Sequence, residues 1–133
     1  MLELKLQELQ VIALQDSEAS RAKIDAALPG ICKDFEALSW ACTDGMFSRQ
    51  YQIQDLAASI LEKAKWSDGL GDSIGDHLFM LMRETIRPEQ RYAQFRMACA
   101  LYNHGWRRPE IVKVLKDAPD DVNDIAQKYL SQE

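Results

Sequence analysis

Hydrophobic side chains recur every three or four residues along most of the chain, and polar side chains fill the positions between them. This spacing is typical of helices that bury one stripe of side chains, whereas a half-buried strand would alternate at every second residue. The stretch from Ser48 to Ala64 shows it most clearly, because Ile53, Leu56 and Ile60 fall on one helical face. The pattern therefore predicts an all-α protein.

Proline and glycine mark where several of the predicted helices begin and end. Proline suits the first turn of a helix, because its missing N–H would be unpaired there, and glycine suits the position after the last turn, because it enters the left-handed region cheaply. We therefore expect helices to begin at Pro88, Pro109 and Pro119, and one to end at Gly105 with His104 as its C-cap. Similar signals place the remaining helices at about residues 2–13, 16–28, 31–44, 48–64 and 72–86.

Two local features sharpen the prediction for the first half of the chain. Asp16 or Ser17 is expected to cap the second helix, and Pro29-Gly30 is expected to interrupt the chain after it. The third helix would then carry Phe35 on its buried stripe and end near Gly45. In all, we expect a single helical domain over residues 1–133, built as a compact bundle or short right-handed solenoid of about six to eight helices arranged as antiparallel hairpins.

Composition places the chain among ordinary globular proteins. It has 133 residues, 47% hydrophobic and 28% charged, with a formal net charge of −5. Three cysteines without disulfide-scaffold spacing favour reduced thiols, and the amphipathic start from Leu2 carries charges that a secretory signal would lack. No stretch approaches the roughly 18 apolar residues of a membrane span. We therefore expect a cytoplasmic protein that does not enter a membrane.

Charge is distributed unevenly along the chain. Residues 83–116 carry eight basic and three acidic side chains, a net charge of +5. Residues 1–82 carry seven and thirteen, and residues 117–133 carry one and five. A basic island between acidic flanks indicates either a binding surface or a region neutralised by internal ion pairs.

The segment 85–130 resembles HEAT-type helical repeats. In that family the second helix of a repeat begins with Asp and Pro, continues with Val and a residue that is usually Arg, and places Ala and Leu on its packing face. The matching residues here are Asp117, Pro119, Val122, Ala126 and Leu130, with Asn123 in the place of the usual Arg, and Arg91, Ala98 and Leu101 one unit earlier. The resemblance implies a non-catalytic scaffold that binds partners along a helical face.

Residues 97–130 are also similar to the ubiquitin-associated three-helix fold. That family has a Gly-aromatic loop after its first helix and an aliphatic pair at its end, and both contact a partner protein. The resemblance would place a protein contact at Gly105, Trp106, Tyr129 and Leu130.

Few residues in the sequence suggest chemistry. Gly69 to Gly75 matches neither the dinucleotide nor the P-loop spacing, so we expect a connecting loop. Carboxylates at steps of four beside His77 lack the offsets of a calcium loop, and neither histidine lies in a catalytic signature. We therefore expect no metal, no cofactor and no enzymatic activity. The alternative is an enzyme site around His77, Asp72 and Asp76, or a metal site that also uses Asp68.

Cysteine and tryptophan add further candidates. Cys99 and Cys42 fall on apolar stripes, which predicts burial, and Cys32 is the thiol expected to be most exposed. Trp40 is expected in the core. Trp66 and Trp106 stand at loop junctions, where tryptophan either covers a core or anchors a partner.

The function predicted from these patterns is a non-enzymatic helical protein-interaction module, an adaptor or scaffold component, that binds a macromolecular partner. Its predicted contact residues are Arg83, Arg87, Arg91, Trp106, Arg107 and Arg108. A protein partner is favoured, and nucleic acid is disfavoured because acidic residues are interleaved with the arginines, although Tyr92 and Phe95 suit base stacking.

Two alternative functions stay open. One is a small acidic inhibitor or immunity-type protein that blocks an enzyme or a nucleic-acid-binding complex with Asp117, Asp120, Asp121 and Asp124. The other is an accessory subunit associated with nucleic acid. A homo-oligomer formed through Leu2 to Ala13 is a further alternative.

Overall fold

A computed structural model describes residues 6–66, 71–84 and 87–131, with the side chains of residues 71 and 72 outside that description. The described residues form eight α-helices and no strand, which confirms the predicted all-α class. Contacts are dense within two compact units, Met1–Lys65 and Trp66–Glu133, called unit 1 and unit 2 below. A single domain over 1–133, and its arrangement as a solenoid, stay predictions.

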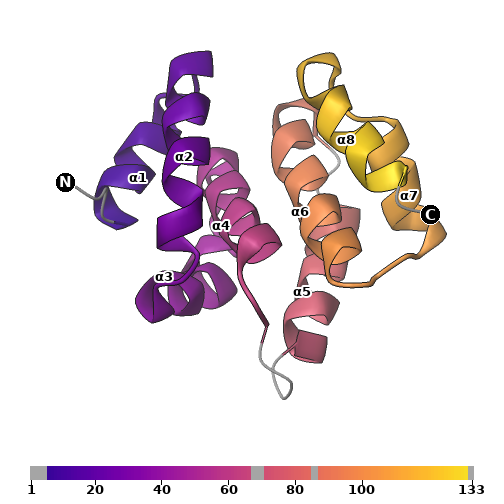
Figure 1. The fold of residues 1–133 in the computed structure, drawn as a ribbon, viewed down its shortest axis with the longest axis horizontal. Coiled ribbons are helices and arrows are strands. Elements are labelled where there is room, and N and C mark those ends of the chain that lie inside the picture. The colour runs from indigo at the N-terminus through magenta and orange to yellow at the C-terminus, as the bar shows by residue number, and fades with distance from the viewer. Residues whose placement is uncertain (1–5, 67–70, 85–86, 132–133) are drawn as a thin grey trace. The chain divides into compact units, whose positions relative to one another are not determined.

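Unit 1 contains helices α1 (Leu6–Leu14), α2 (Glu18–Ile31), α3 (Phe35–Trp40) and α4 (Tyr51–Lys63), with a π-helical turn at Ala41–Gly45. Helices α1, α2 and α4 pack against one another, and α3 and the π-turn pack on α4 (Figure 1). Leu9, Leu28, Leu56 and Ile60 are buried among them. This packing buries an apolar stripe on each of α1, α2 and α4, as the three-four spacing predicts.

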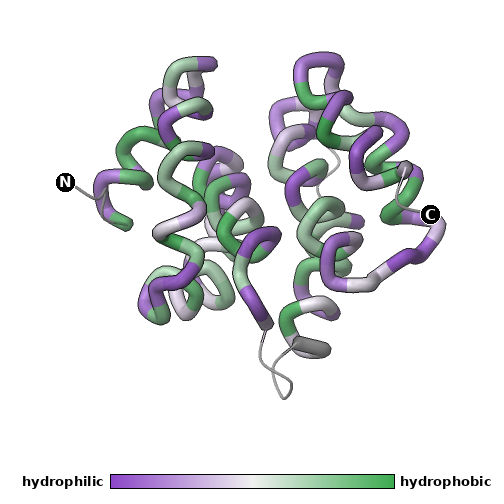
Figure 2. Tube along the Cα trace, viewed as in Figure 1, coloured by the Kyte–Doolittle hydropathy of each residue, from purple (hydrophilic) through white to green (hydrophobic). Residues whose placement is uncertain are grey.

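Unit 2 contains α5 (Gly71–Glu84), α6 (Arg91–Asn103), α7 (Pro109–Lys116) and α8 (Asn123–Leu130), with short 3-10 turns at Pro88–Gln90 and Asp120–Val122. Helix α6 is the central element, since it packs against α5, α7 and α8. Hydrophobic and hydrophilic stretches alternate along these helices (Figure 2). Phe95, Met97, Leu101 and Tyr102 are buried along α6.

The predicted boundaries at Pro88, Pro109 and Gly105 are confirmed in unit 2. Pro88 and Pro109 occupy the first helical positions of their elements, and α7 spans Pro109–Lys116. Gly105 adopts φ +93° after the C-cap His104, and its N–H bonds to the Tyr102 carbonyl at 3.1 Å. These positions match the physical roles that proline and glycine have at helix ends. The predicted helix start at Pro119 is wrong, because Pro119 precedes the 3-10 turn Asp120–Val122 and α8 begins only at Asn123.

Unit 1 departs from the prediction at its third helix. Helix α2 continues through Pro29 and ends at Ile31, so the expected interruption at Pro29-Gly30 is wrong. Proline is tolerated because it lies in the last turn and at the surface, where the lost backbone bond costs least. The next helix begins later, at Phe35, with Asp34 as its cap, and Phe35 is 81% exposed rather than part of a buried stripe.

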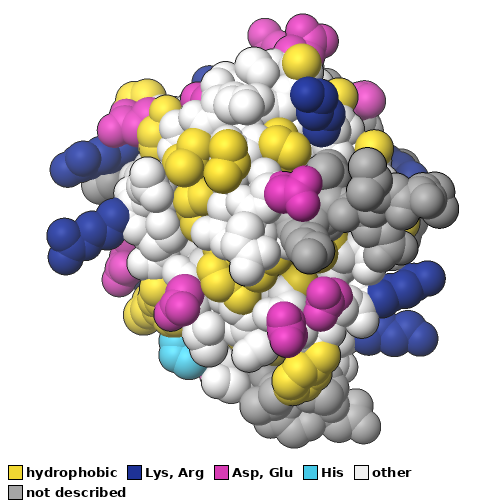
Figure 3. Space-filling model, turned by 90° about the vertical axis from the view of Figure 1, so that its left-hand side faces the viewer, with side chains coloured by type: hydrophobic (Ala, Val, Ile, Leu, Met, Phe, Trp, Pro, Cys, Tyr) yellow, Lys and Arg dark blue, Asp and Glu magenta, His cyan; other side chains and the backbone are white. Residues whose placement is uncertain are grey.

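Other hydrophobic side chains of unit 1 also reach the surface. Val11 is 62% exposed, and Leu14 and Phe47 are 43% and 46% exposed. Figure 3 shows hydrophobic side chains interspersed with charged ones on the face that it draws. None of the helices in the described ranges combines the length and the apolar character needed to cross a lipid bilayer.

Candidate functional site

Two arginines and two aromatic rings of unit 2 form one cluster, called the arginine–aromatic cluster below: Phe79, Arg83, Trp106 and Arg108. The guanidinium carbon of Arg83 lies 5.5 Å from the Phe79 ring centroid. That of Arg108 lies 4.9 Å from the same ring and 5.0 Å from the Trp106 ring. The two rings are 6.2 Å apart and tilted by 34°. Each guanidinium is thus within the distance at which an aromatic face attracts a cation.

The loop after α6 positions the tryptophan of this cluster. The N–H of Trp106 bonds to the Leu101 carbonyl at 2.9 Å, and Gly105 beside it adopts the left-handed conformation. This pair of features is a Schellman ending, in which the residue after the glycine bonds back into the last helical turn. The ending fixes the backbone of Trp106 and turns the chain toward Arg107 and Arg108.

Helix α5 accommodates the indole because it has a glycine at the contact. A Cβ added at Gly75 would lie 2.8 Å from Nε1 of Trp106 and closer still to its six-membered ring. No larger residue would let the ring lie on the backbone of α5 in this way. Gly75, Phe79 and Arg83 follow one another at steps of four, so they lie on a single face of α5. This face contributes the glycine on which Trp106 packs, the Phe79 ring and the Arg83 guanidinium.

Arg107 makes a separate contact on the neighbouring helix. Its guanidinium carbon lies 4.0 Å from the Tyr102 ring centroid, and its Nη1 donates to the Tyr102 hydroxyl at 3.2 Å. The Tyr102 ring is buried and meets Tyr129 of α8 edge-on at 6.1 Å. Arg107 itself is exposed, so it presents a cation at the surface on a rigid aromatic base.

Trp66 also belongs to unit 2 and stacks on the helix end. Its ring is 3.7 Å from that of His104 with an interplanar angle of 11°. Both side chains are half-buried. The position of His104 as the C-cap of α6 agrees with the prediction from its sequence context.

The structure separates the six predicted contact residues into two sets. Arg83, Trp106 and Arg108 meet in the arginine–aromatic cluster, and Arg107 is adjacent to it in the chain. Among the contacts between described residues, neither Arg87 nor Arg91 touches the cluster. Arg87 is the N-cap of the turn Pro88–Gln90, and Arg91 donates from Nη2 to the Asp117 carbonyl at 3.3 Å.

Internal ion pairing does not neutralise these arginines within the described part of the chain. Arg21 pairs with Asp16 at 3.4 Å in unit 1, and no ion pair seen between described residues joins a carboxylate to the five predicted contact arginines. All five are exposed: Arg83, Arg87, Arg91, Arg107 and Arg108. Their positive charge is therefore directed to solvent.

The acidic candidates are exposed as well. Asp117, Asp120 and Asp124 lie on the surface around the start of α8. Asp121 accepts a hydrogen bond from the Tyr92 hydroxyl at 2.6 and 2.7 Å on its two carboxylate oxygens. That bond ties the 3-10 turn before α8 to the start of α6.

The alternative enzyme or metal site predicted from the sequence combines His77 with Asp68, Asp72 and Asp76. His77 is exposed, and its Nδ1 lies 2.8 Å from the Ser73 carbonyl of its own helix. No group of three His, Cys, Asp or Glu side chains in the described ranges could hold a metal ion. Asp68 and the side chain of Asp72 lie outside these ranges, as do Gly69 and Leu70 of the expected loop. The rest of the expected loop, Gly71 to Gly75, forms the start of α5, so the prediction of a loop there is wrong.

The three thiols differ in burial. Cys99 is fully buried, as predicted, whereas Cys32 and Cys42 are half-buried. Burial raises the pKa of the Cys42 thiol above its ordinary value of 9.0. A thiol of this kind is less nucleophilic at neutral pH, since the thiolate is the reactive form.

Comparison of the chain with protein-family models, with curated proteins and with solved structures found no match.

Proposed function

We propose that this protein is a non-enzymatic helical interaction module that binds an acidic surface of a partner protein. The proposed contact residues are Arg83, Trp106, Arg107 and Arg108 of unit 2. The observation that carries the proposal is that three exposed guanidinium groups lie over aromatic rings and have no carboxylate partner among the described residues.

An arginine placed in this way is prepared for binding. The ring restricts the side chain before a partner arrives, so less conformational entropy is lost when the complex forms. The guanidinium still has several N–H donors, and these suit the bidentate geometry of a carboxylate. Arg107 donates one hydrogen bond to the Tyr102 hydroxyl, and its remaining N–H groups can donate to a partner.

The residue types also match those that contribute most to protein interfaces. Tryptophan and arginine are over-represented among residues whose truncation weakens binding strongly. Trp106 is half-buried, so part of its ring already packs on Gly75 while the rest is accessible. A partner covering it would bury apolar surface next to the charged contacts, which strengthens both.

A protein partner fits this surface better than nucleic acid. The chain carries a net charge of −5, and exposed aspartates at 117, 120, 121 and 124 lie in the same unit as the arginines. A continuous phosphate backbone would be repelled by those carboxylates, whereas a compact acidic patch need only meet the arginines.

A pair of matched double variants tests the proposal. Arg83→Glu/Arg108→Glu reverses two charges of the proposed surface, and Lys116→Glu/Lys128→Glu makes the same charge change at exposed lysines of α7 and α8. Wild type and both variants serve as bait in affinity purification from the native host, with quantitative mass spectrometry of the eluates. Circular dichroism establishes that each bait is folded.

We expect at least one protein to be recovered by wild type and by the lysine variant, and to fall about tenfold or more with the arginine variant. Its affinity, measured with purified components, should decrease as salt is added, because the contacts are ionic. Recovery of the same proteins in the same amounts by all three folded baits would refute the proposed surface.

A further inference from the structure

Arg107 differs from the other arginines of the proposed surface in how it is held. Its guanidinium carbon lies 4.0 Å from the Tyr102 ring centroid, and its Nη1 donates to the hydroxyl of the same ring at 3.2 Å. Arg83 and Arg108 lie farther from the Phe79 centroid, at 5.5 and 4.9 Å, and no side-chain hydrogen bond of either is seen between described residues. Two contacts with one ring therefore fix both the position and the orientation of the Arg107 guanidinium.

The ring beneath Arg107 is itself restrained. Tyr102 is fully buried on the central helix α6. Tyr129 of α8, which is also buried, meets the Tyr102 ring edge-on, with 6.1 Å between the centroids and an interplanar angle of 70°. Edge-to-face contact is a preferred arrangement of two aromatic rings. Helix α8 therefore restrains the Tyr102 ring, and through that ring it restrains Arg107.

The hydrogen bond to Tyr102 leaves one edge of the Arg107 guanidinium unused. A buried tyrosine hydroxyl needs a hydrogen-bond partner, and Nη1 of Arg107 supplies one. Nη1 is the nitrogen on the same side as Cδ, so Nε and Nη2 form the opposite edge and retain their N–H groups. Two parallel N–H groups on one edge match the two oxygens of a carboxylate. A lysine carries the same charge without such an edge.

We propose that Tyr102 and Tyr129 are positioning residues, which fix Arg107 so that its Nε–Nη2 edge binds one carboxylate of the partner in a bidentate pair. Arg107 then determines the geometry that the surface accepts, whereas Arg83 and Arg108 contribute positive charge. This inference rests on the proposed function, because it describes how one contact residue of that surface recognises an acidic partner.

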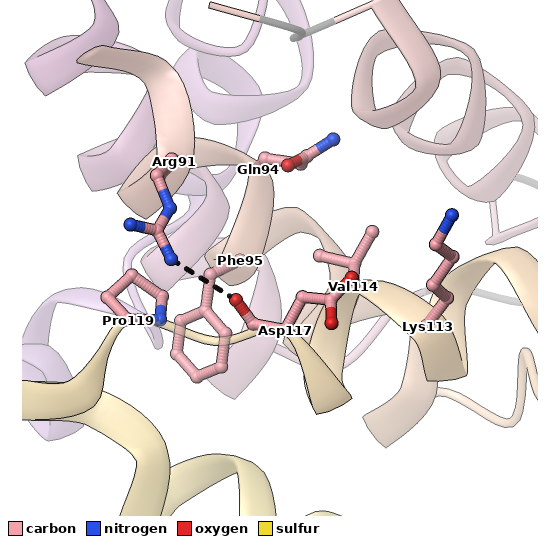
Figure 4. Close-up of a pocket in the computed structure, with 7 residues that line it drawn as sticks. All are labelled: Arg91, Gln94, Phe95, Lys113, Val114, Asp117 and Pro119. Atoms are coloured by element: carbon pink, nitrogen blue, oxygen red, sulfur yellow. Dashed lines mark hydrogen bonds between the residues drawn. The ribbon is translucent and has the colours of Figure 1, made fainter. Parts of the chain in front are cut away.

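Arg91 offers a matched arginine outside the proposed surface. Like Arg107 it is exposed and hydrogen-bonded, since its Nη2 donates to the Asp117 carbonyl at 3.3 Å (Figure 4). This bond lies beside a shallow cavity of about 300 Å³ between α6, α7 and the turn after α7. The acceptor is a backbone carbonyl rather than a tyrosine hydroxyl. Arg91→Lys therefore makes the same chemical change as Arg107→Lys away from the tyrosine pair.

The first experiment tests the positioning and needs no partner. It records the Nε–Hε signals of the ¹⁵N-labelled full chain by two-dimensional NMR, and the Arg107 signal is identified by its loss in Arg107→Lys. The ring current of Tyr102 should shift this signal away from that of free arginine. Tyr129→Leu should move it toward the free position, whereas Tyr129→Phe, which keeps the ring, should leave it in place. The Arg83 signal is the internal control and should not move.

Tyr102→Phe removes the hydroxyl and keeps the ring. Without the bond to the hydroxyl, the Arg107 guanidinium should rotate faster, and its separate Nη signals should merge. If Tyr129→Leu fails to fold, Tyr102→Phe decides the question. An Arg107 signal at the free-arginine position in wild type, or one that the folded Tyr129→Leu and Tyr102→Phe variants leave unchanged, would overturn the positioning role.

The second experiment tests the bidentate contact. The affinity purification described above is repeated with Arg107→Lys and Arg91→Lys as baits. A protein whose recovery depends on Arg83 and Arg108 should fall about fivefold with Arg107→Lys, which corresponds to the loss of about one hydrogen bond, and should be unchanged with Arg91→Lys.

The outcomes separate this inference from the proposed function. Unchanged recovery of that protein by Arg107→Lys would overturn the bidentate contact and leave the proposed function standing. An equal fall with Arg107→Lys and Arg91→Lys would also overturn it, because the tyrosine pair would then make no difference. If no protein depends on Arg83 and Arg108, the proposed function fails and the bidentate contact fails with it.

Discussion

Both units pack a tryptophan against a glycine, but the contact has a different role in each unit. In unit 1, Gly45 lies against Trp40 and Ala57, and a Cβ added there would be 3.0 Å from the indole and 2.8 Å from the alanine. In unit 2, Gly75 lies against Trp106. Trp40 and Gly45 belong to one continuous helical segment, whereas Trp106 comes from a loop and has Arg108 over its ring. A glycine in contact with a tryptophan thus stabilises helix packing in unit 1 and the arginine–aromatic cluster in unit 2.

The units also begin their helices differently. Unit 1 uses side-chain caps: Ser17 and Ser20 form a reciprocal capping box at α2, and Asp34 accepts from the Glu36 N–H at 2.9 Å at α3. Unit 2 uses Pro88 and Pro109 in its first turns. The Gln90 side chain also accepts from the Arg87 N–H at 3.4 Å, and the N-cap Arg108 of α7 makes no side-chain cap bond. Caps add hydrogen bonds to the folded state, and proline restricts the unfolded chain.

Net charge does not distinguish the two units, since unit 1 carries seven basic and ten acidic residues and unit 2 carries nine and eleven.

The largest expected effect on stability comes from adding a side chain at Gly75 of unit 2. Gly75→Ala places a methyl group where the Trp106 ring lies, so the ring must move and the arginine–aromatic cluster with it. We expect the free energy of unfolding, measured by urea titration, to fall by about 1–3 kcal/mol. Near-ultraviolet circular dichroism should change as the indole leaves its site.

Gly30→Ala is the matched control, because nothing lies within 4 Å of the added atom and Gly30 is also helical. It should be neutral or stabilising by up to about 1 kcal/mol, since alanine is the better helix former. Equal stability of Gly75→Ala and wild type would show that the Trp106 contact contributes little.

The next effect concerns the cap of α2 in unit 1. Ser17→Ala removes the oxygen that accepts from the Ser20 N–H at 3.0 Å, and we expect a loss of about 1 kcal/mol in the free energy of unfolding. Ser39→Ala on α3 is the control, as no side-chain hydrogen bond of Ser39 is seen in the described structure, and should change stability by less than about 0.5 kcal/mol. A neutral Ser17→Ala would mean that solvent replaces the cap at no cost.

The corresponding start in unit 2 should respond more weakly. Pro109→Ala keeps α7 intact, because the N–H at the first helical position needs no partner within the helix. The substitution does increase the conformational entropy of the unfolded chain. We expect a loss of about 0.4–1 kcal/mol, seen as a lower urea midpoint with helix content unchanged by circular dichroism. A change in helix content would indicate instead that Pro109 defines where α7 begins.

The sequence predicted where helices begin and end better than it predicted which helix faces other elements cover. The positions of Pro109 and Gly105 depend on local backbone chemistry, so they could be predicted from neighbouring residues. Phe35 could not, because its exposure depends on where α3 begins after Asp34, which is four residues beyond the end of the expected break at Gly30. Periodicity says which face is apolar and does not say whether another element covers it.

The candidate site shows the same limit. Gly75, Phe79 and Arg83 are spaced by four residues in the sequence, but the expected loop extended to Gly75, so their common helix face became clear only with α5. The contact of Arg108 with Phe79 could not be predicted either, because it joins distant residues through the turn at Gly105. The cavity beside Arg91 likewise depends on how α6 and α7 pack, which no local pattern encodes.

The smallest expected effect is a pH dependence from the thiol at Cys42 in unit 1. Its pKa is raised by burial above the ordinary value of 9.0, so the unfolded chain releases this proton at lower pH than the folded one. Between those two pKa values the folded state holds more protons, and the free energy of unfolding therefore falls as pH rises. Cys42→Ala removes this contribution. We expect wild type to lose more stability than Cys42→Ala when urea titrations at about pH 8 and about pH 10 are compared, and identical losses would show that the thiol titrates alike in both states.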